Sequence, residues 1–143
     1  MKPIKYAISF VIYSQDPSKF LIVQRPSDDE NLPDIWGLPA GSVKDNETFK
    51  ECVIRSGREK LGVELKPTKF IGRNNIEREN YILHMEVYEA EIVSGEPEVP
   101  QSIQGITQYQ KWRWGVSSDL KNAASKGSLC SQIYLSISML MKQ

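Results

Sequence analysis

Four charged residues follow one another at intervals of four in the middle of the chain: Glu47, Glu51, Arg55 and Glu59. On a helix such residues are neighbours, so Arg55 can pair with a carboxylate and hold Glu59 in one rotamer. Carboxylates bind Mg²⁺ and Mn²⁺, which also bridge to phosphate oxygens. The spacing therefore predicts a site for phosphate chemistry, with Glu59 as a metal ligand supported by Glu47 or Glu51. A solvated charged helix face is the alternative.

Positions 56, 59 and 60 share one face if the segment from about Glu47 to Leu61 is helical. Three carboxylates at these positions would hold divalent cations. In this chain only Glu59 is a carboxylate, because the other two positions are Ser56 and Lys60. At about 4 Å and an effective dielectric constant of about 20, two like unit charges repel by about 4 kcal/mol. The ammonium group of Lys60 is therefore expected to weaken metal binding.

Residues 41–63 resemble the Nudix box. The pattern of that family is Gly, five residues, Glu, seven residues, then Arg-Glu-aliphatic-any-Glu-Glu-any-Gly-aliphatic; this chain fits it at Gly41, Glu47, Arg55, Glu59, Gly62 and Val63. It departs from the pattern at Ser56, Gly57 and Lys60. The resemblance implies the α/β class and the Nudix fold, an α/β/α sandwich around a mixed β-sheet. It also implies Mg²⁺ or Mn²⁺ as cofactor, and catalytic roles for Glu59, Arg55 and Glu47, with Arg55 and Glu47 linked.

Strand and helix patterns alternate along the chain and must position this box. Apolar and β-branched runs predict strands at 4–13, 20–24, 68–76, 81–92 and 109–116, and a short strand and turn at 36–41. Asp45 or Asn46 is expected to cap the box helix. A last helix is expected from about Ser128, with a core-facing apolar stripe of Leu129, Ile133, Ile137 and Leu140.

Glycines mark three points of the box. Gly41 and Gly62 are expected at turns that need a positive φ or a close backbone approach. Gly57 lies inside the helix, where glycine costs about 1 kcal/mol relative to alanine. We therefore expect the helix to be looser or bent at Gly57.

Replacement metal ligands are expected in the polar loop 94–108. In several Nudix enzymes a carboxylate outside the box supplies a metal ligand or a general base, which makes Glu96 and Glu98 the candidates here, Glu98 foremost. His84 is the only histidine. It could act as a base, but a hydrogen-bonded side chain on a sheet face is the favoured interpretation.

Four residues are candidates for substrate binding: Trp36, Arg25, Lys60 and Gly41. Trp36 stands just before the box and could form the wall of a nucleoside pocket, and Arg25 closes a strand and could meet a phosphate. Trp112 and Trp114 share one strand face, where core packing is favoured over stacking on a base.

Composition excludes several other classes of protein. The 18 basic and 18 acidic residues cancel, so no net field attracts long nucleic acids, and no apolar run reaches membrane-spanning length. Cys52 and Cys130 form no pattern and predict buried thiols in a reducing compartment, hence a cytoplasmic location. Residues 1–143 are expected to form one Nudix-like domain; the sequence leaves a homodimer open.

Two functions remain open at this point. The first is hydrolysis of a nucleoside diphosphate-linked or other small diphosphate substrate, with weak or atypical metal dependence. The second is a catalytically inactive Nudix-fold module that binds a nucleotide or phosphate, with Lys60 contacting the phosphates. A purely structural or protein-interaction role has no positive support in the sequence.

Overall fold

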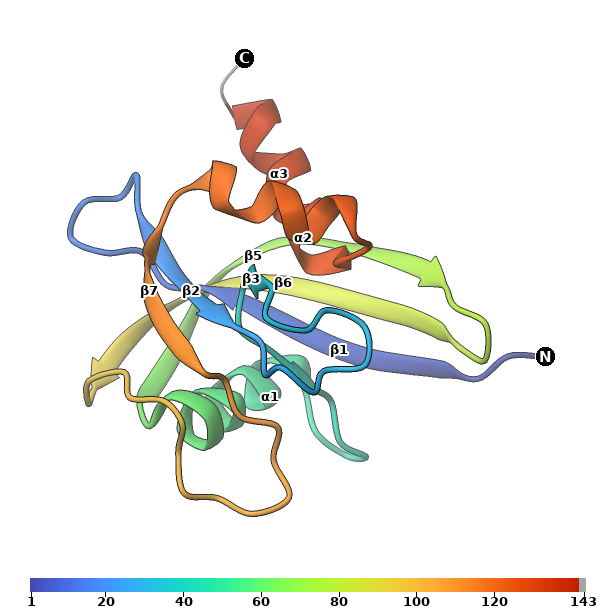
Figure 1. Cartoon of the computed structure of the whole chain (residues 1–143), viewed down its shortest axis with the longest axis horizontal. Helices are drawn as coiled ribbons and strands as arrows, with labels where there is room; N and C mark the ends of the chain where they lie inside the picture. Colours follow the sequence, from blue (N-terminus) through green and yellow to red (C-terminus); the bar gives the residue numbers. More distant parts are fainter. Residues whose placement is uncertain (142–143) are drawn as a thin grey trace.

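Within residues 1–141, the part of the chain that the computed structural model describes, the strands form two β-sheets (Figure 1). The larger sheet has the order β4 (Ala40–Ser42), β1 (Ile4–Val11), β6 (Ile82–Ser94), β5 (Glu64–Glu77). It is mixed, because β1 runs parallel to β6 while its other pairs are antiparallel. The smaller sheet is antiparallel, in the order β3 (Trp36–Gly37), β2 (Phe20–Gln24), β7 (Lys111–Gly115).

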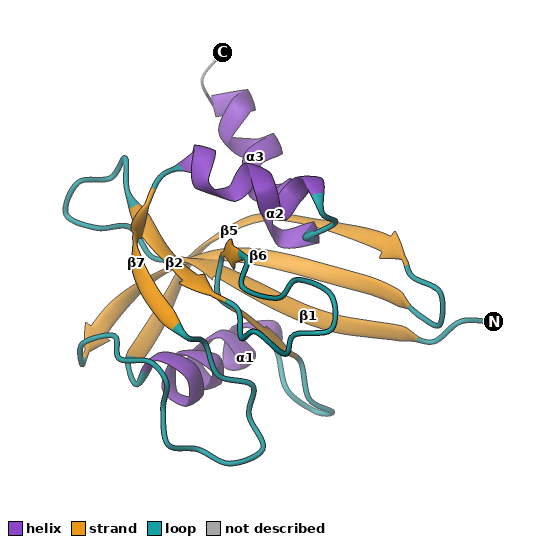
Figure 2. Cartoon of the chain, viewed as in Figure 1, coloured by secondary structure: helices purple, strands orange, loops and turns teal. Residues whose placement is uncertain are grey.

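Helices cover both faces of the larger sheet (Figure 2). The box helix α1 (Phe49–Ser56) lies on one face; α2 (Lys121–Ser125) and α3 (Leu129–Met141) lie on the other. The expected α/β class and the α/β/α sandwich around a mixed sheet are confirmed.

Strand β1 shows why the sequence forms a sheet that is buried on both faces. Successive side chains of a strand point to opposite faces. Ile8 and Phe10 enter the core cluster beneath α1, whereas Ala7 and Val11 enter the cluster beneath α3. Ser9 is buried between them and donates a hydrogen bond to the Pro39 carbonyl oxygen (2.7 Å). The buried part of β1, residues 7–11, is therefore apolar except for Ser9, whose hydroxyl is satisfied.

The predicted cap of the box helix is wrong. Asn46 adopts a left-handed turn conformation (φ 63°) before the helix begins. The cap is Thr48, whose Oγ1 accepts a hydrogen bond from the Glu51 N–H (3.1 Å), while the Glu51 carboxylate accepts one from the Thr48 N–H (2.9 Å). This is a capping box, Thr-x-x-Glu, in which both partners satisfy free N–H groups of the first turn.

The box helix changes its winding at Gly57. The α-helix ends at Ser56 and continues as the π-helical turn η1 (Gly57–Leu61), which Gly62 terminates in the left-handed region (φ 70°). Gly57 is buried, and a Cβ atom there would lie 2.6 Å from Leu65 Cδ1. Close packing against β5 therefore requires glycine, and the expected loosening takes the form of a change of helix type.

Two other expectations need correction. The turn η2 (Ser117–Leu120) and the helix α2 were not predicted, because such short segments carry little periodicity. At the start of η2, the Val116 N–H donates a hydrogen bond to Asp119 Oδ2 (2.8 Å). The apolar stripe of α3 is buried at Leu129 and Ile133, but Leu140 is 62% exposed.

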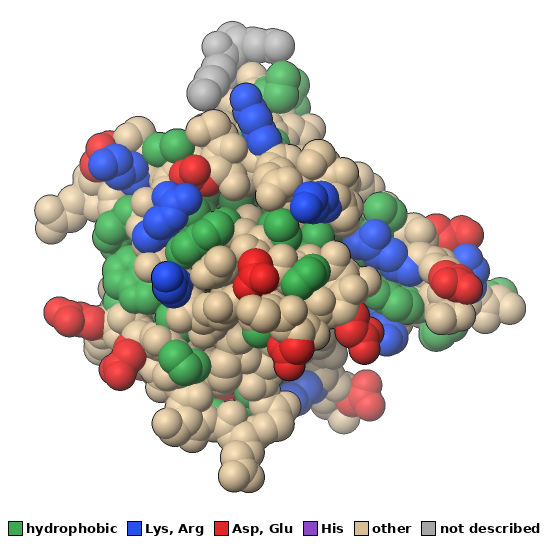
Figure 3. Space-filling view, viewed as in Figure 1, with side chains coloured by type: hydrophobic (Ala, Val, Ile, Leu, Met, Phe, Trp, Pro, Cys, Tyr) green, Lys and Arg blue, Asp and Glu red, His purple; other side chains and the backbone are tan. Residues whose placement is uncertain are grey.

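Charges of both signs are interspersed over the face seen in Figure 3, as the balanced composition predicts. Within residues 1–141, no helix is both long enough and apolar enough to cross a membrane.

Candidate functional site

Arg55 links the beginning of the box to its end. Its Nε and Nη2 donate to the two carboxylate oxygens of Glu47 (2.7 and 3.0 Å), and its Nη1 donates to Glu59 Oε1 (2.6 Å). Nη2 also donates to the Ser42 carbonyl oxygen (2.7 Å). These bonds from Arg55 lower the pKa of Glu47 to about 2 and raise the pKa of Arg55 itself. The Arg55–Glu47 link that the family resemblance implied is therefore present.

Ser56 does not face a ligand site. Its side chain is fully buried between Cys52 and Gly41, and a Cβ atom on Gly41 would overlap the Ser56 hydroxyl. Positions 56, 59 and 60 were expected to share one face, but Ser56 is buried whereas Glu59 and Lys60 are half-buried. Burial also raises the pKa of the neighbouring Cys52 thiol to about 11, so this thiol stays neutral.

Lys60 reaches from the π-helical turn to the strand before the box. Its Nζ donates to the Ala40 carbonyl oxygen (2.6 Å) and lies 5.3 Å from the centroid of the Tyr109 ring. The Tyr109 hydroxyl accepts from the Ala40 N–H (2.9 Å) and lies 3.2 Å from the same carbonyl oxygen. The half-buried ammonium group is thus held by a carbonyl and an aromatic face, and no carboxylate lies within 4.0 Å of it among residues 1–141.

Lys60 lines a cavity of about 310 Å³ that we call the cleft. The cleft brings together Arg25, Gly41 and Lys60, three of the four predicted substrate-binding residues, and it contains one carboxylate, that of Asp29. Arg25 is ion-paired with Asp29 (3.2 Å). The other lining residues are Ala7, Pro26, Ala40, Ser42, Tyr81, Leu83, Met85, Thr107 and Tyr109.

The predicted metal ligands do not form a metal site. Glu59 is bound to Arg55 and is not among the residues that line the cleft, and the Glu51 carboxylate is committed to the helix cap. Glu98 is exposed, and its N–H donates to the Leu61 carbonyl oxygen (2.9 Å). No group of three or more histidine, cysteine or acidic side chains within residues 1–141 could hold an ion. The residues present therefore do not fit the Mg²⁺ or Mn²⁺ that the family resemblance implied.

The other candidate residues pack or form hydrogen bonds within the fold. The Trp36 ring packs beneath the Arg113 guanidinium (4.8 Å to the centroid) and does not line the cleft. His84 lies between Asn75 and Glu86, with ring nitrogens 2.6 and 3.0 Å from their side-chain oxygens. Trp112 packs edge-to-face with Trp114 and against the core beneath α1.

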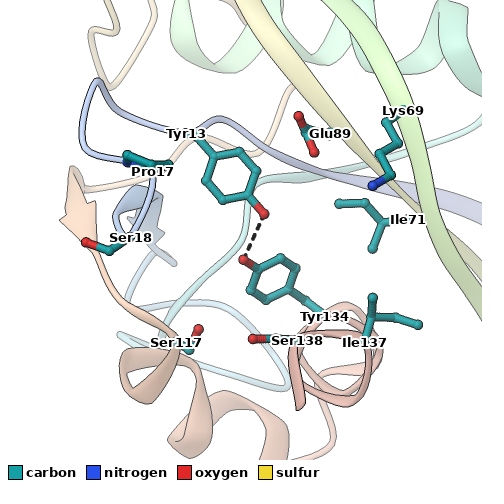
Figure 4. A pocket seen from close by; sticks show the side chains of 10 residues that line it. All are labelled: Tyr13, Pro17, Ser18, Lys69, Ile71, Glu89, Ser117, Tyr134, Ile137 and Ser138. Carbon is teal, nitrogen blue, oxygen red and sulfur yellow. Dashed lines mark hydrogen bonds between the residues drawn. The ribbon is translucent and has the colours of Figure 1, made fainter. Parts of the chain in front are cut away.

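A separate hollow of about 320 Å³ lies beside α3, on the sheet face opposite α1 (Figure 4). The hydroxyl groups of Tyr13 and Tyr134 meet there (3.0 Å), below the cross-strand pair Lys69 and Glu89. None of the predicted site residues lines this hollow. The cleft is therefore the better candidate for the site of the box.

The chain matches the model of a known protein family. The model of the NUDIX domain matches residues 4–115. The chain belongs to the Nudix superfamily. Curated relatives of this Nudix protein include m7GpppN-mRNA hydrolase of Saccharomyces cerevisiae (29% identical over 99 residues, 66% of this chain and 10% of that protein) and dihydroneopterin triphosphate diphosphatase of Escherichia coli (34% over 59 residues, 41% and 37%). The chain spans only these minor parts of their lengths.

Solved structures show the same fold. The MutT protein of Methanosarcina mazei Go1 has a TM-score of 0.75 at 19% identity, covering 99% of this chain and 98% of that one. A UDP-X diphosphatase has a TM-score of 0.74 at 13% identity, with 99% and 64% covered. At these identities the likeness concerns the Nudix fold alone.

Tyr109 and Asp29 are among the cleft residues that sequence reasoning missed. Tyr109 was placed at the start of a predicted strand, with nothing to indicate its hydrogen bond to Ala40, 69 residues away. Asp29 lies four residues after Arg25 in a polar loop, a spacing that allows the observed ion pair.

Proposed function

We propose that this Nudix domain binds the diphosphate group of a small molecule in the cleft, with the Lys60 ammonium group as counter-charge in place of a divalent cation. The observation that carries the proposal is the bond from Lys60 Nζ to the Ala40 carbonyl oxygen at the cleft wall (2.6 Å). Nucleoside diphosphate derivatives are the first ligand class to consider, because the relatives of this chain are named for capped RNA and nucleotide substrates.

The electrostatics of the cleft support an anionic ligand. Lys60 and Arg25 contribute two positive charges and Asp29 one negative charge. Arg25 is already paired with Asp29, so Lys60 is the cation that a phosphate would meet. At about 4 Å and an effective dielectric constant of about 20, such a pair gains about 4 kcal/mol before desolvation, and the same ammonium repels a metal ion.

Lys60→Gln tests this proposal by removing the charge while keeping most of the side-chain length. We expect adenosine 5′-diphosphate to bind the parent protein without metal and to bind the variant about 10- to 100-fold more weakly, because a charge-assisted bond is lost. Isothermal titration calorimetry with and without Mg²⁺ measures both affinities, and Mg²⁺ should add little to the parent.

Lys50→Gln is the matched control, since Lys50 is an exposed lysine of α1, the helix that leads into the turn of Lys60. Equal affinities in the Lys60 variant and the parent would refute the proposal, as would binding that requires Mg²⁺.

Slow hydrolysis of the bound diphosphate is a second candidate function, favoured by the intact Glu47–Arg55–Glu59 cluster. The reaction would cleave an X-linked nucleoside diphosphate into a nucleoside monophosphate and X-phosphate. Glu59 would accept the proton of the attacking water, which requires its carboxylate to move from Arg55 toward the cleft, because Glu59 does not line the cleft.

Glu59→Gln tests the hydrolytic function. Removal of a general base typically lowers turnover by about 100-fold or more, so we expect such a loss in the release of nucleoside monophosphate with Tm nearly unchanged. Glu91→Gln, an exposed acid on β6, is the control. Unchanged turnover in the Glu59 variant would place the chemistry elsewhere, and a parent without turnover would leave the binding function alone.

Three further expectations belong to this proposal. Two buried free thiols, Cys52 and Cys130, support a reducing, cytoplasmic location. We also expect residues 1–143 to form one domain, as a monomer or a homodimer.

A further inference from the structure

The cleft adjoins a second, larger cavity of about 630 Å³. The two cavities share four lining residues: Arg25, Tyr81, Leu83 and Met85. A ligand whose diphosphate lies beside Lys60 can therefore extend past Arg25 into the second cavity. We call this second cavity the annex.

Arg78 lines the annex and is half-buried. It follows the end of β5, and its Nη2 donates to the Gly127 carbonyl oxygen in the turn between α2 and α3 (3.0 Å). Among residues 1–141, no carboxylate lies within 4.0 Å of its guanidinium group. Glu30 and Glu79 also line the annex, but both are exposed and neither forms an ion pair with Arg78.

The lack of a carboxylate partner distinguishes Arg78 from the other partly buried arginines of the chain. Arg25 and Arg55 are half-buried too, and each is ion-paired with a carboxylate. A partly buried charge without a partner is costly, whereas an anionic ligand would relieve that cost. Lys126, which also lines the annex, would add a second positive charge.

We propose that the annex binds a phosphate group of the ligand that is separate from the diphosphate, through Arg78 with support from Lys126. The ligand class is then a nucleoside 5′-diphosphate that carries an additional phosphate on its ribose, at the 2′ or the 3′ oxygen. A guanidinium group suits this role, because its planar fork can donate two parallel hydrogen bonds to one phosphate. This inference rests on the proposed binding of the diphosphate in the cleft.

The test compares three ligands by isothermal titration calorimetry: adenosine 5′-diphosphate and its 2′- and 3′-phosphorylated forms. We expect one of the phosphorylated forms to bind the parent protein about 10-fold more tightly than adenosine 5′-diphosphate, the effect typical of a charge-assisted pair. The two forms distinguish which ribose oxygen carries the phosphate. In Arg78→Gln the gain should disappear, while the affinity for adenosine 5′-diphosphate stays the same.

Two further variants separate recognition from a purely structural role of the bond to Gly127. Arg73→Gln removes an exposed arginine of β5, the strand that Arg78 follows, and should keep the full gain. Arg78→Lys keeps the charge without the fork and should keep part of it. Loss of thermal stability in Arg78→Gln with an unchanged affinity ratio between the ligands would overturn the inference.

The comparison of ligands on the parent protein needs no variant. It therefore tests whether the added phosphate raises the affinity even if Arg78→Gln fails to fold. Equal affinities for the three ligands would overturn the annex proposal and leave the cleft proposal standing. An absence of binding for all three would overturn both.

Discussion

Ser56→Glu is expected to destabilise the fold strongly instead of restoring a metal site, although glutamate is the residue of the family pattern at this position. Ser56 is fully buried, and its hydroxyl lies against the backbone of Gly41. A longer, ionised side chain would have to displace the strand before the box or bury a charge without a partner. We expect a loss of about 3–5 kcal/mol in the free energy of unfolding, the range typical of an uncompensated buried charge.

Urea denaturation at neutral pH measures this loss, with Ser56→Ala as the control. Alanine removes only the hydroxyl, whose distance to Cys52 Sγ is 3.9 Å, so its effect should stay within about 1 kcal/mol. A Ser56→Glu protein that is as stable as the parent and binds Mg²⁺ would mean that position 56 can face the cleft after all.

Acid is expected to remove a second large contribution to stability, the pairing of Glu47 with Arg55. Hydrogen bonds from Arg55 hold the pKa of Glu47 at about 2, below its ordinary value of 4.5. A folded-state pKa that lies below the unfolded value stabilises the fold above the unfolded pKa, and this stability is lost as pH falls toward the folded pKa. A shift of this size corresponds to roughly 3 kcal/mol, lost between about pH 5 and pH 2.

Glu47→Gln isolates this contribution, because glutamine keeps the shape of the side chain but does not titrate. The parent protein should lose more stability between about pH 5 and pH 2 than the variant does, as measured by urea denaturation at a series of pH values. Glu77→Gln serves as control, since the pair of Glu77 with Lys2 is largely exposed and should contribute little. Parallel curves for parent and Glu47→Gln would show that the ion pair does not set the acid stability.

The positions of the strands along the chain and of the box helix could be predicted because each depends on local patterns. Nearly continuous apolar runs predicted the strands. In β1 both faces are apolar because its side chains enter the core clusters on both sides of the sheet. The spacing of Arg55 from Glu59 predicted their ion pair, since one helical turn brings them together. The Thr48–Glu51 capping box was also visible in the sequence, but the nearby Asp45 and Asn46 offered competing caps.

The features that could not be predicted depend on contacts between segments that are distant in sequence. The close approach of Gly41 to Ser56 buries a position that helical periodicity places on the ligand face. The π-helical turn depends on the packing of Gly57 against Leu65. Lys60 could be identified as an unusual cation, but its partners Ala40 and Tyr109 come from a strand and a loop that only the folded chain brings together. Arg25 joins them from the end of β2.

The place of β1 in the larger sheet also bears on how the chain folds as it leaves the ribosome. The first strand lies between β4 and β6, and its parallel partner β6 spans Ile82–Ser94. The centre of the sheet therefore cannot close until β6 has been synthesised, because pairing of distant segments waits for the later one. Until then β1, whose side chains enter both core clusters, lacks its parallel partner. The nascent chain is thus expected to need protection from aggregation until β6 emerges.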